Sequence, residues 1–371
     1  PELSVTGYTC ADLFFQTRLT DTAVESLEHI AQETKSCDTI IVVGAPLYHR
    51  NRLYNCGIVI QSGLVRGVVP KSFLPNYKEF YEKRWFTPGT DVFDEWITLN
   101  GEDVPFGVDL VFAGEHNLIL GVEICEDLWN VVPPSSRLAQ AGATVIGNLS
   151  ASNELVGKAD YRRDLVRGQS ARCVAAYVYS GAGPRESTTD VVFGGHGLIA
   201  ENGIVLAETA RFVASNQLLC GDVDCERLRV TRVSETVMPD NDMLEVQVIE
   251  LSALAVPSEL RREVTPLPFV PSEPSIRDER CHEIFSIQSC GLAKRLEHTH
   301  VHIVVIGVSG GLDSTLALLV ARAAFERLGH DLDHIIAVTM PGFGTSKRTL
   351  TNAVSLCRAI GAEVREIDIV P

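Results

Sequence analysis

The sequence has no long apolar run and comparatively little positive charge. No stretch of its 371 residues approaches the roughly 18 consecutive apolar residues that a membrane-spanning helix requires. The 32 basic residues are outnumbered by 48 acidic ones, so the formal net charge is −16. This balance argues against a protein that mainly binds nucleic acid, although a small nucleotide needs only a local phosphate site. We therefore predict no membrane span and no nucleic-acid partner.

Paired-cysteine motifs, targeting signals and internal repeats are also absent. None of the ten cysteines has Cys-x-x-Cys spacing, and no cysteine–histidine cluster has metal-ligand spacing. Scattered cysteines of this kind are typical of reduced thiols in a cytosolic protein, so we predict a cytoplasmic location. No secretory signal is visible, but the chain starts at Pro1 rather than at methionine, and we expect its amino end to be truncated.

The length and composition that remain are those of two globular domains. Hydrophobic residues make up 45% of the chain and charged residues 22%, as in ordinary folded proteins. A polar stretch at 251–275 holds five prolines: Pro257, Pro266, Pro268, Pro271 and Pro274. Such a stretch is typical of a linker. We predict a first domain at 1–250 and a second domain at 276–371.

Short apolar strands and amphipathic helices indicate an α/β fold for the first domain. The predicted strands are 39–47, 54–60, 63–69, 118–124, 143–149, 175–180, 197–200, 204–207 and 247–249, and the predicted helices are 21–33, 136–141 and 161–173. We expect a hairpin around Gln61-Ser62 and a type I′ turn at Asn202-Gly203. The segment Pro1–Ser4 has the pattern of a strand end.

Strands and helices alternate in the second domain, which favours a parallel, doubly wound sheet. The predicted strands are 301–308, 334–340 and 363–369, and the predicted helices are 278–296, 314–328 and 347–360. Three parallel strands leave an uncovered sheet edge, so we expect this domain to be incomplete at its carboxyl end.

Cys125 follows the apolar strand 118–124, and the carboxyl end of a strand is where α/β folds present reactive groups. By itself it could be a packed thiol, but a cysteine becomes a nucleophile when a base and a cation lie nearby. Lys71, between Pro70 and apolar residues, could be that cation, held rigid and partly desolvated. Glu2 could be the base. The alternatives are a solvated surface lysine and an exposed terminal carboxylate.

Three groups of residues resemble the nitrilase superfamily, and in particular the glutamine amidohydrolase domain of the glutamine-dependent NAD synthetases. They are Pro1–Tyr8, Pro70–Tyr77 with Phe80–Glu82, and Gly121–Trp129. The resemblance covers roughly the first 250 residues and implies a four-layer αββα sandwich. It also implies a triad of Glu2, Lys71 and Cys125, and contacts to glutamine from Tyr77, Ser152 and Lys158.

A second motif follows a predicted strand and opens a predicted helix, and it reads Gly307-Val308-Ser309-Gly310-Gly311-Leu312-Asp313-Ser314. Its backbone N–H groups and the helix amino end can bind phosphate. The Gly-Lys-Ser/Thr of a P-loop is missing. The motif resembles the PP-loop of enzymes that split ATP to AMP and pyrophosphate, which implies ATP binding and Asp313 as a Mg²⁺ ligand. The segment Met340–Arg348 resembles the second nucleotide loop of NAD synthetases.

The two resemblances together imply one pathway of nitrogen transfer. Glutamine is hydrolysed at Cys125, ATP adenylates deamido-NAD in the second domain, and ammonia displaces AMP to give NAD. We expect a homo-oligomer, and an isolated 371-residue chain that makes no NAD. The alternatives are a free-standing nitrilase-type amidase, another PP-loop amidotransferase that makes GMP or asparagine, and a non-catalytic assembly subunit. The PP-loop argues against the first and the Glu-Lys-Cys pattern against the other two.

Overall fold

The computed structural model describes residues 1–187, 190–235, 238, 245–255, 259–342 and 347–369. The chain divides into two units, Pro1–Glu263 and Val264–Pro371. The division falls inside the stretch 251–275 that the sequence predicts as a linker. The two units are described separately below. None of the helices in these ranges is long and apolar enough to cross a bilayer.

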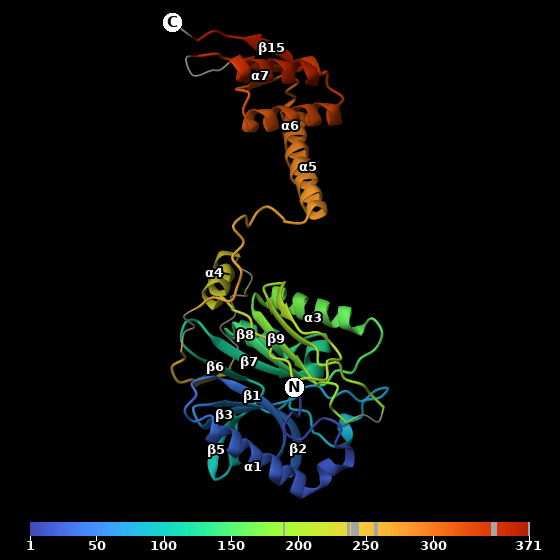
Figure 1. The fold of residues 1–371 in the computed structure, drawn as a ribbon, viewed down its shortest axis with the longest axis vertical. Helices are drawn as coiled ribbons and strands as arrows, with labels where there is room; N and C mark the ends of the chain where they lie inside the picture. The colour runs from blue at the N-terminus through green and yellow to red at the C-terminus, as the bar shows by residue number, and fades with distance from the viewer. Residues whose placement is uncertain (188–189, 236–237, 239–244, 256–258, 343–346, 370–371) are drawn as a thin grey trace. The chain divides into compact units, whose positions relative to one another are not determined.

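Two β-sheets form the centre of the first unit (Figure 1). The first sheet has the order β1-β2-β3-β5-β4, with β1 (Ile41–His49), β2 (Arg52–Gln61), β3 (Leu64–Pro70), β4 (Glu95–Leu99) and β5 (Glu102–Phe106). The second has the order β11-β10-β9-β8-β7-β6-β12, with β6 (Leu110–Ala113), β7 (Ile119–Ile124), β8 (Val145–Ser150), β9 (Ala176–Gly181), β10 (Gly197–Glu201), β11 (Ile204–Glu208) and β12 (Gln247–Glu250).

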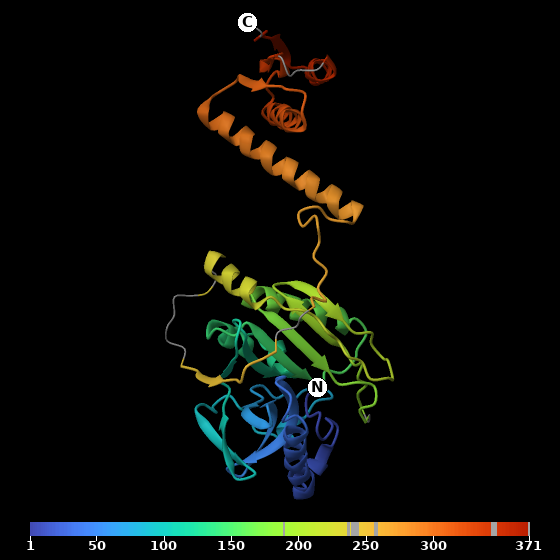
Figure 2. The ribbon, with the colours of Figure 1, turned by 60° about the vertical axis from the view of Figure 1, so that its left-hand side comes forward.

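Helices cover the outer face of each sheet (Figures 1 and 2). Helix α1 (Thr17–Glu33) buries Leu27 and Ala31 against the first sheet, because apolar residues four apart share one helix face. Helices α2 (Pro134–Gln140) and α3 (Lys158–Cys173) cover the second sheet. Apolar side chains from both sheets, including those of Val59, Phe112 and Leu149, form the core between them. The first unit is therefore the predicted αββα sandwich.

The smaller elements of the first unit complete its outline. Helix α4 (Cys225–Glu235) packs Leu228 against Val174 and Ala176. Single 3₁₀ turns are η1 (Ala11–Phe15), η2 (Glu82–Arg84) and η3 (Cys125–Trp129).

Tight turns set the register of the hairpins. Asn202 and Gly203 have φ of 44° and 84°, so the predicted type I′ turn joins β10 and β11. The first hairpin turns at Ser62 (φ 52°) and Gly63 (φ 81°), one residue later than the sequence predicts. Of these two residues only Gly63 favours a left-handed φ, so the sequence marks one of the two left-handed positions and not the other. For this reason the prediction placed the turn one residue early.

The predicted strand end at Pro1–Ser4 is wrong. These residues form turns, and Leu3 has a left-handed φ of 48° that ends any extended run. The segment is nevertheless attached to both sheets. The Glu2 N–H donates to the Ser150 carbonyl at 3.3 Å, and the Val5 N–H donates to the Gly44 carbonyl at 3.0 Å. Backbone hydrogen bonds therefore bring Glu2 to the carboxyl end of β8.

The second unit contains the predicted parallel sheet, with the order β13-β14-β15. Its elements are α5 (Pro274–Thr299), β13 (Val304–Gly307), α6 (Leu312–Leu328), η4 (Leu332–His334), β14 (Ile335–Thr339), α7 (Lys347–Ile360) and β15 (Glu363–Glu366). Residues from α5, α6, α7 and the sheet form one core, which includes Leu296, Phe325 and Ile360. Only the carboxyl-terminal part of α5 contributes buried residues to this core. The preceding turns of the helix extend beyond the rest of the second unit (Figure 2).

Candidate active site

Cys125 lies where β7 ends and η3 begins. Its φ is 47°, a left-handed value that is rare for a residue other than glycine and that often marks a functional site. The turn is held by Asp127, whose carboxylate accepts the N–H of Ile124 at 2.9 Å and the N–H of Phe73 at 2.8 Å. The buried Asp127 therefore connects the turn of Cys125 to the loop that follows Lys71. Sequence reasoning gave Asp127 no role.

Lys71 follows β3, and its backbone is fixed on both sides. Its N–H donates to the Asn55 carbonyl at 2.8 Å, and its own carbonyl accepts the Gly89 N–H at 2.8 Å. The side chain is buried, and Nζ lies 2.5 Å from Glu2 Oε1. The alternatives of a solvated lysine and an exposed Glu2 are therefore wrong, since both groups are withdrawn from solvent in contact with each other.

The carboxylate of Glu2 is oriented by three donors. Oε1 accepts the Asn55 side-chain amide at 2.7 Å in addition to Lys71, and Oε2 accepts the Ala151 N–H at 3.0 Å. These donors come from β2 and from the residues that directly follow β3 and β8, so the two sheets together fix the position of the carboxylate. In the described part of the chain no hydrogen bond joins Cys125 Sγ to Glu2 or to Lys71, and their effect on the thiol is electrostatic.

Glu82 is a second buried carboxylate beside Lys71. Its oxygens lie 2.8 and 2.9 Å from Lys71 Nζ, and Oε1 also accepts the Tyr8 hydroxyl at 2.7 Å. Glu82 belongs to a segment that carries the family resemblance, but it was assigned no role. Its neighbours Lys83 and Arg84 make the segment look like a solvated charged stretch, so the local sequence does not show its burial.

Burial and charge set the protonation states of this group. Burial would lower the pKa of Lys71, but Glu2 and Glu82 raise it well above its usual range. Burial raises the pKa of Glu82 to about 7, a rise that Lys71 opposes. Burial, with Glu2, raises the pKa of the Cys125 thiol, and Lys71 opposes that rise. Lys71 is therefore charged, whereas Cys125 is a neutral thiol at rest and needs a base to react.

Two of the predicted glutamine-binding residues, Tyr77 and Lys158, lie close enough to Cys125 to interact with its charge. The Tyr77 hydroxyl donates to the Glu126 carboxylate at 2.9 Å, and half of the Tyr77 side chain is exposed. Lys158 Nζ donates to Asn153 Oδ1 at 2.5 Å and lies 5.2 Å from the centre of the Trp129 ring. Burial lowers the pKa of Lys158, and the charge of a Cys125 thiolate would raise it.

The third predicted residue, Ser152, is held from behind by a buried arginine. Arg162 donates to Ser152 Oγ at 3.4 Å, to the Asn153 carbonyl at 3.1 Å and to His196 Nδ1 at 3.0 Å. It also pairs with Glu154 at 2.9 Å. Burial lowers the pKa of His196 to about 4, so this histidine is neutral and can accept at Nδ1. The loop after β8 is thereby made rigid where it carries Ser152.

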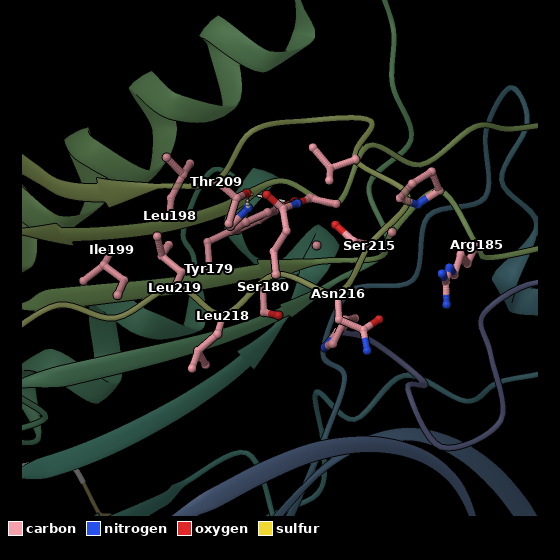
Figure 3. Close-up of a pocket in the computed structure, with 18 of the residues that line it drawn as sticks. Tyr179, Ser180, Arg185, Leu198, Ile199, Thr209, Ser215, Asn216, Leu218 and Leu219 are labelled. Atoms are coloured by element: carbon pink, nitrogen blue, oxygen red, sulfur yellow. Dashed lines mark hydrogen bonds between the residues drawn. The ribbon is translucent and has the colours of Figure 1, made fainter.

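A cavity of about 490 Å³ lies beside β9 and β10, and Pro1, next to Glu2 in the chain, is among its lining residues, whereas Glu2, Lys71 and Cys125 are not. Figure 3 shows Tyr179, Arg185, Thr209 and Asn216 among the side chains that line it. The cavity and the triad approach each other at Tyr179, whose ring also lies 5.9 Å from the Arg162 guanidinium.

The phosphate-loop motif connects β13 to α6 in the second unit. Gly310 has a φ of 85°, and a Cβ there would lie 2.4 Å from the Thr349 carbonyl oxygen. Only glycine fits this position. Ser309 Oγ lies 3.2 Å from Ser314 Oγ, and Asp313 occupies the first turn of α6. The later motif Met340–Arg348 includes residues 343–346, which lie outside the described residues.

Comparisons with known proteins agree with this architecture. The family model for carbon-nitrogen hydrolases matches residues 1–233, and the model for NAD synthases matches residues 285–371. Curated glutamine-dependent NAD(+) synthetases of Mycobacterium tuberculosis and Mycobacterium leprae are 45% and 44% identical over the whole of this chain. The chain spans only 56% of the length of each.

The fold is likewise shared with a solved structure. The glutamine-dependent NAD(+) synthetase of Cytophaga hutchinsonii matches with a TM-score of 0.54 and 24% identity, over 100% of this chain and 58% of that one. The predicted resemblance and fold class are confirmed. The chain belongs to the carbon-nitrogen hydrolase family.

Proposed function

We propose that the first unit hydrolyses glutamine with Cys125 as the nucleophile, Glu2 as the base and Lys71 as the oxyanion donor. The observation that carries this proposal is the buried contact of 2.5 Å between Glu2 and Lys71 beside a strained cysteine at a strand end. A charged lysine and a carboxylate are expensive to bury, and such pairs are typical of sites that need both charges for chemistry.

In this reaction Glu2 takes the proton of the Cys125 thiol, and the sulfur attacks the side-chain amide carbon of glutamine. Lys71 and a backbone N–H stabilise the oxyanion that develops. Glu2 then gives its proton to the leaving ammonia, which leaves a thioester on Cys125. Glu2 next removes a proton from water, which attacks the thioester; the carbon–sulfur bond breaks, Glu2 returns the proton to Cys125, and glutamate is released. Glu82 keeps Lys71 charged while Glu2 changes its protonation state.

Glutamine recognition fits the polar groups near Cys125. We propose that Lys158 binds the α-carboxylate of glutamine, because it is a cation held between Asn153 and the ring of Trp129. Glu126, with Tyr77, is suited to the α-ammonium group. Ser152 is fixed by Arg162 and completes the polar lining.

The second unit is proposed to bind ATP and to adenylate deamido-NAD, which ammonia from the first unit then converts to NAD. The residues Gly307–Ser314 supply backbone N–H groups and a helix amino end for the phosphates. Mg²⁺ needs only one or two carboxylates when phosphate oxygens complete its shell, and Asp313 is one exposed carboxylate at this loop. The ion would neutralise phosphate charge there. We expect the protein to act in the cytoplasm as a homo-oligomer.

The test separates the two activities. Wild type and Cys125→Ala are assayed for glutamate release from glutamine, and for NAD formation from ATP and deamido-NAD with either glutamine or ammonium. We expect Cys125→Ala to lose every glutamine-dependent reaction and to keep whatever ammonium-dependent synthesis the wild type has. A folded Cys125→Ala variant that still releases glutamate would contradict the proposal, and Cys357→Ala, which removes a buried thiol of the second unit, is the control.

A further inference from the structure

Two buried hydroxyl groups beside Cys125 lack regular hydrogen bonds. Among the described residues, Ser150 Oγ and the Tyr179 hydroxyl are both buried without a partner of regular geometry. Ser150 is 0% and Tyr179 2% exposed. Other fully buried serines are paired, since Ser170 Oγ donates to the Ala175 carbonyl at 2.8 Å and Ser135 Oγ accepts from Gln169 at 3.0 Å. An unpaired buried hydroxyl calls for a physical reason.

Strand pairing places Ser150 next to Cys125. In the parallel pair of β7 and β8, Ile124 lies opposite Leu149, so Cys125 and Ser150 come next at the same end of neighbouring strands. The Ser150 carbonyl accepts the N–H of Glu2 at 3.3 Å and of Ala182 at 2.9 Å, which fixes its backbone. Ser150 therefore cannot move away from the nucleophile without breaking contacts on both sides.

The same sheet geometry brings in Tyr179. Asn148 lies opposite Tyr179 in the pair of β8 and β9, and Ser150 is two residues beyond Asn148. Residues two apart in a strand share a face, so the Ser150 and Tyr179 side chains lie on the same face of the sheet. Behind them, the Arg162 guanidinium lies 5.9 Å from the Tyr179 ring and donates to Ser152 Oγ. The hydroxyls thus form a polar group between this cation and the thiol.

A negative charge on Cys125 or on Tyr179 favours a hydrogen bond from the Ser150 hydroxyl. Burial raises the pKa of the Cys125 thiol, and a hydrogen bond from Ser150 to the thiolate opposes that rise. Burial also raises the pKa of Tyr179, which Arg162 and Ser150 oppose. A neutral thiol is a weak acceptor, whereas a thiolate is a strong one. This difference explains why Ser150 has no regular partner while Cys125 is protonated.

We propose that Ser150 is a further catalytic residue, whose hydroxyl donates a hydrogen bond to Cys125 Sγ as the thiol loses its proton to Glu2. Tyr179 is a positioning residue whose hydroxyl donates a hydrogen bond to Ser150 Oγ. No covalent bond forms at Ser150, and its proton stays on oxygen throughout. The inference rests on the proposed role of Cys125 as the nucleophile.

The experiment measures the thiol itself, so it does not depend on glutamine turnover. The 371-residue chain is treated with iodoacetamide from pH 6 to 10, and alkylation of each cysteine is followed by peptide mass spectrometry. In Ser150→Ala we expect the Cys125 rate below its apparent pKa to fall about ten-fold, because hydrogen bonds to charged groups are strong. The pH profile should shift upward, and Tyr179→Phe should shift it in the same direction by less.

Matched controls keep the result specific. Ser135→Ala and Tyr54→Phe remove a buried serine and a buried tyrosine hydroxyl elsewhere in the first unit, and both should keep the wild-type Cys125 profile. The exposed Cys37 provides an internal rate reference in every sample. An unchanged Cys125 profile in folded Ser150→Ala overturns the proposal. If circular dichroism shows that Ser150→Ala is unfolded, the Tyr179→Phe variant provides the test. An unchanged Cys125 alkylation profile in Tyr179→Phe then overturns the proposal.

Discussion

Lys71 Nζ lies 2.8 Å from Glu82 Oε1, and both side chains are buried. Glu2 contacts the same ammonium at 2.5 Å, so one buried cation is shared by two carboxylates. Burial raises the pKa of Glu82 to about 7; Lys71 opposes this rise, and repulsion from the Glu2 carboxylate adds to it. Glu2, Lys71 and Glu82 therefore form one buried charged group beside Cys125.

The first prediction concerns Glu82→Gln. This change keeps the shape of the side chain but removes its charge, so Lys71 must be neutralised by Glu2 alone. Glu2 then becomes a poorer base, and we expect glutamine hydrolysis to fall by about 10²-fold, a typical loss for general acid–base defects. Glutamate release is the measurement, and Glu102→Gln, an exposed carboxylate of β5, is the control. Glutamine hydrolysis at the wild-type rate in Glu82→Gln would show that the charge of Glu82 is not needed for the reaction.

The raised pKa of Glu82 also predicts a pH dependence of stability. The folded state holds its proton up to about pH 7, whereas the unfolded chain releases it near pH 4.5. The stabilisation from this group is therefore present below pH 4.5 and is lost as the pH rises to 7. All three tryptophans lie in the first unit, so their fluorescence follows its unfolding in urea. Glutamine does not titrate, so wild type should lose stability relative to Glu82→Gln from pH 5 to pH 8, and a wild type that gains stability relative to the variant over this range would contradict this assignment.

The next prediction concerns the Asp127 contacts that join the turn at Cys125 to the loop that follows Lys71. Asp127→Ala leaves the N–H groups of Ile124 and Phe73 without their acceptor. We expect the first unit to lose about 2–4 kcal/mol of stability, measured by urea unfolding, and glutamine hydrolysis to fall with it. Asp103→Ala removes an exposed carboxylate that bonds only Thr98 among the described residues, and should change stability by less than about 0.5 kcal/mol.

Lys158 is predicted to act on substrate binding rather than on the nucleophile. Lys158→Met should raise the KM for glutamine about ten-fold, because a charge-assisted bond to the substrate carboxylate is lost. Burial lowers the pKa of Lys158, so the wild-type KM should rise as the pH increases through that lowered value. Lys35→Met, in an exposed loop, is the control. An unchanged KM with a lower kcat would place Lys158 in the chemical step instead.

Gly310 gives a prediction for the second unit. Gly310→Ala would place a Cβ 2.4 Å from the Thr349 carbonyl oxygen at a left-handed φ, so the loop must shift. We expect the second unit to lose a few kcal/mol of stability, seen by circular dichroism, and any ATP binding measured by calorimetry to disappear. In contrast, Gly291→Ala in α5 meets open space and should stabilise the helix by about 1 kcal/mol. Equal behaviour of the two variants would show that the loop is not constrained.

Local signals in the sequence were sufficient for most of the fold. The turn at Asn202-Gly203 could be predicted because a type I′ turn requires two left-handed residues in succession. The same signal at Asn100-Gly101, with φ of 49° and 83°, was overlooked, and with it the hairpin of β4 and β5. Cys125 could be placed because the apolar run of β7 ends immediately before it.

The sequence by itself determined most of the strands and helices, the turn at Asn202-Gly203 and the residue types of the triad. Tertiary structure alone decided which charges are buried and what surrounds them. Glu82 lies in a charged segment, and only packing against Tyr8 and Lys71 removes it from solvent. In the sequence Ser150 is an ordinary serine at the end of a strand, and only the pairing of β7 with β8 brings it next to Cys125. Burial depends on distant segments that fold against a residue, and because no local pattern encodes those contacts, these roles became visible only in three dimensions.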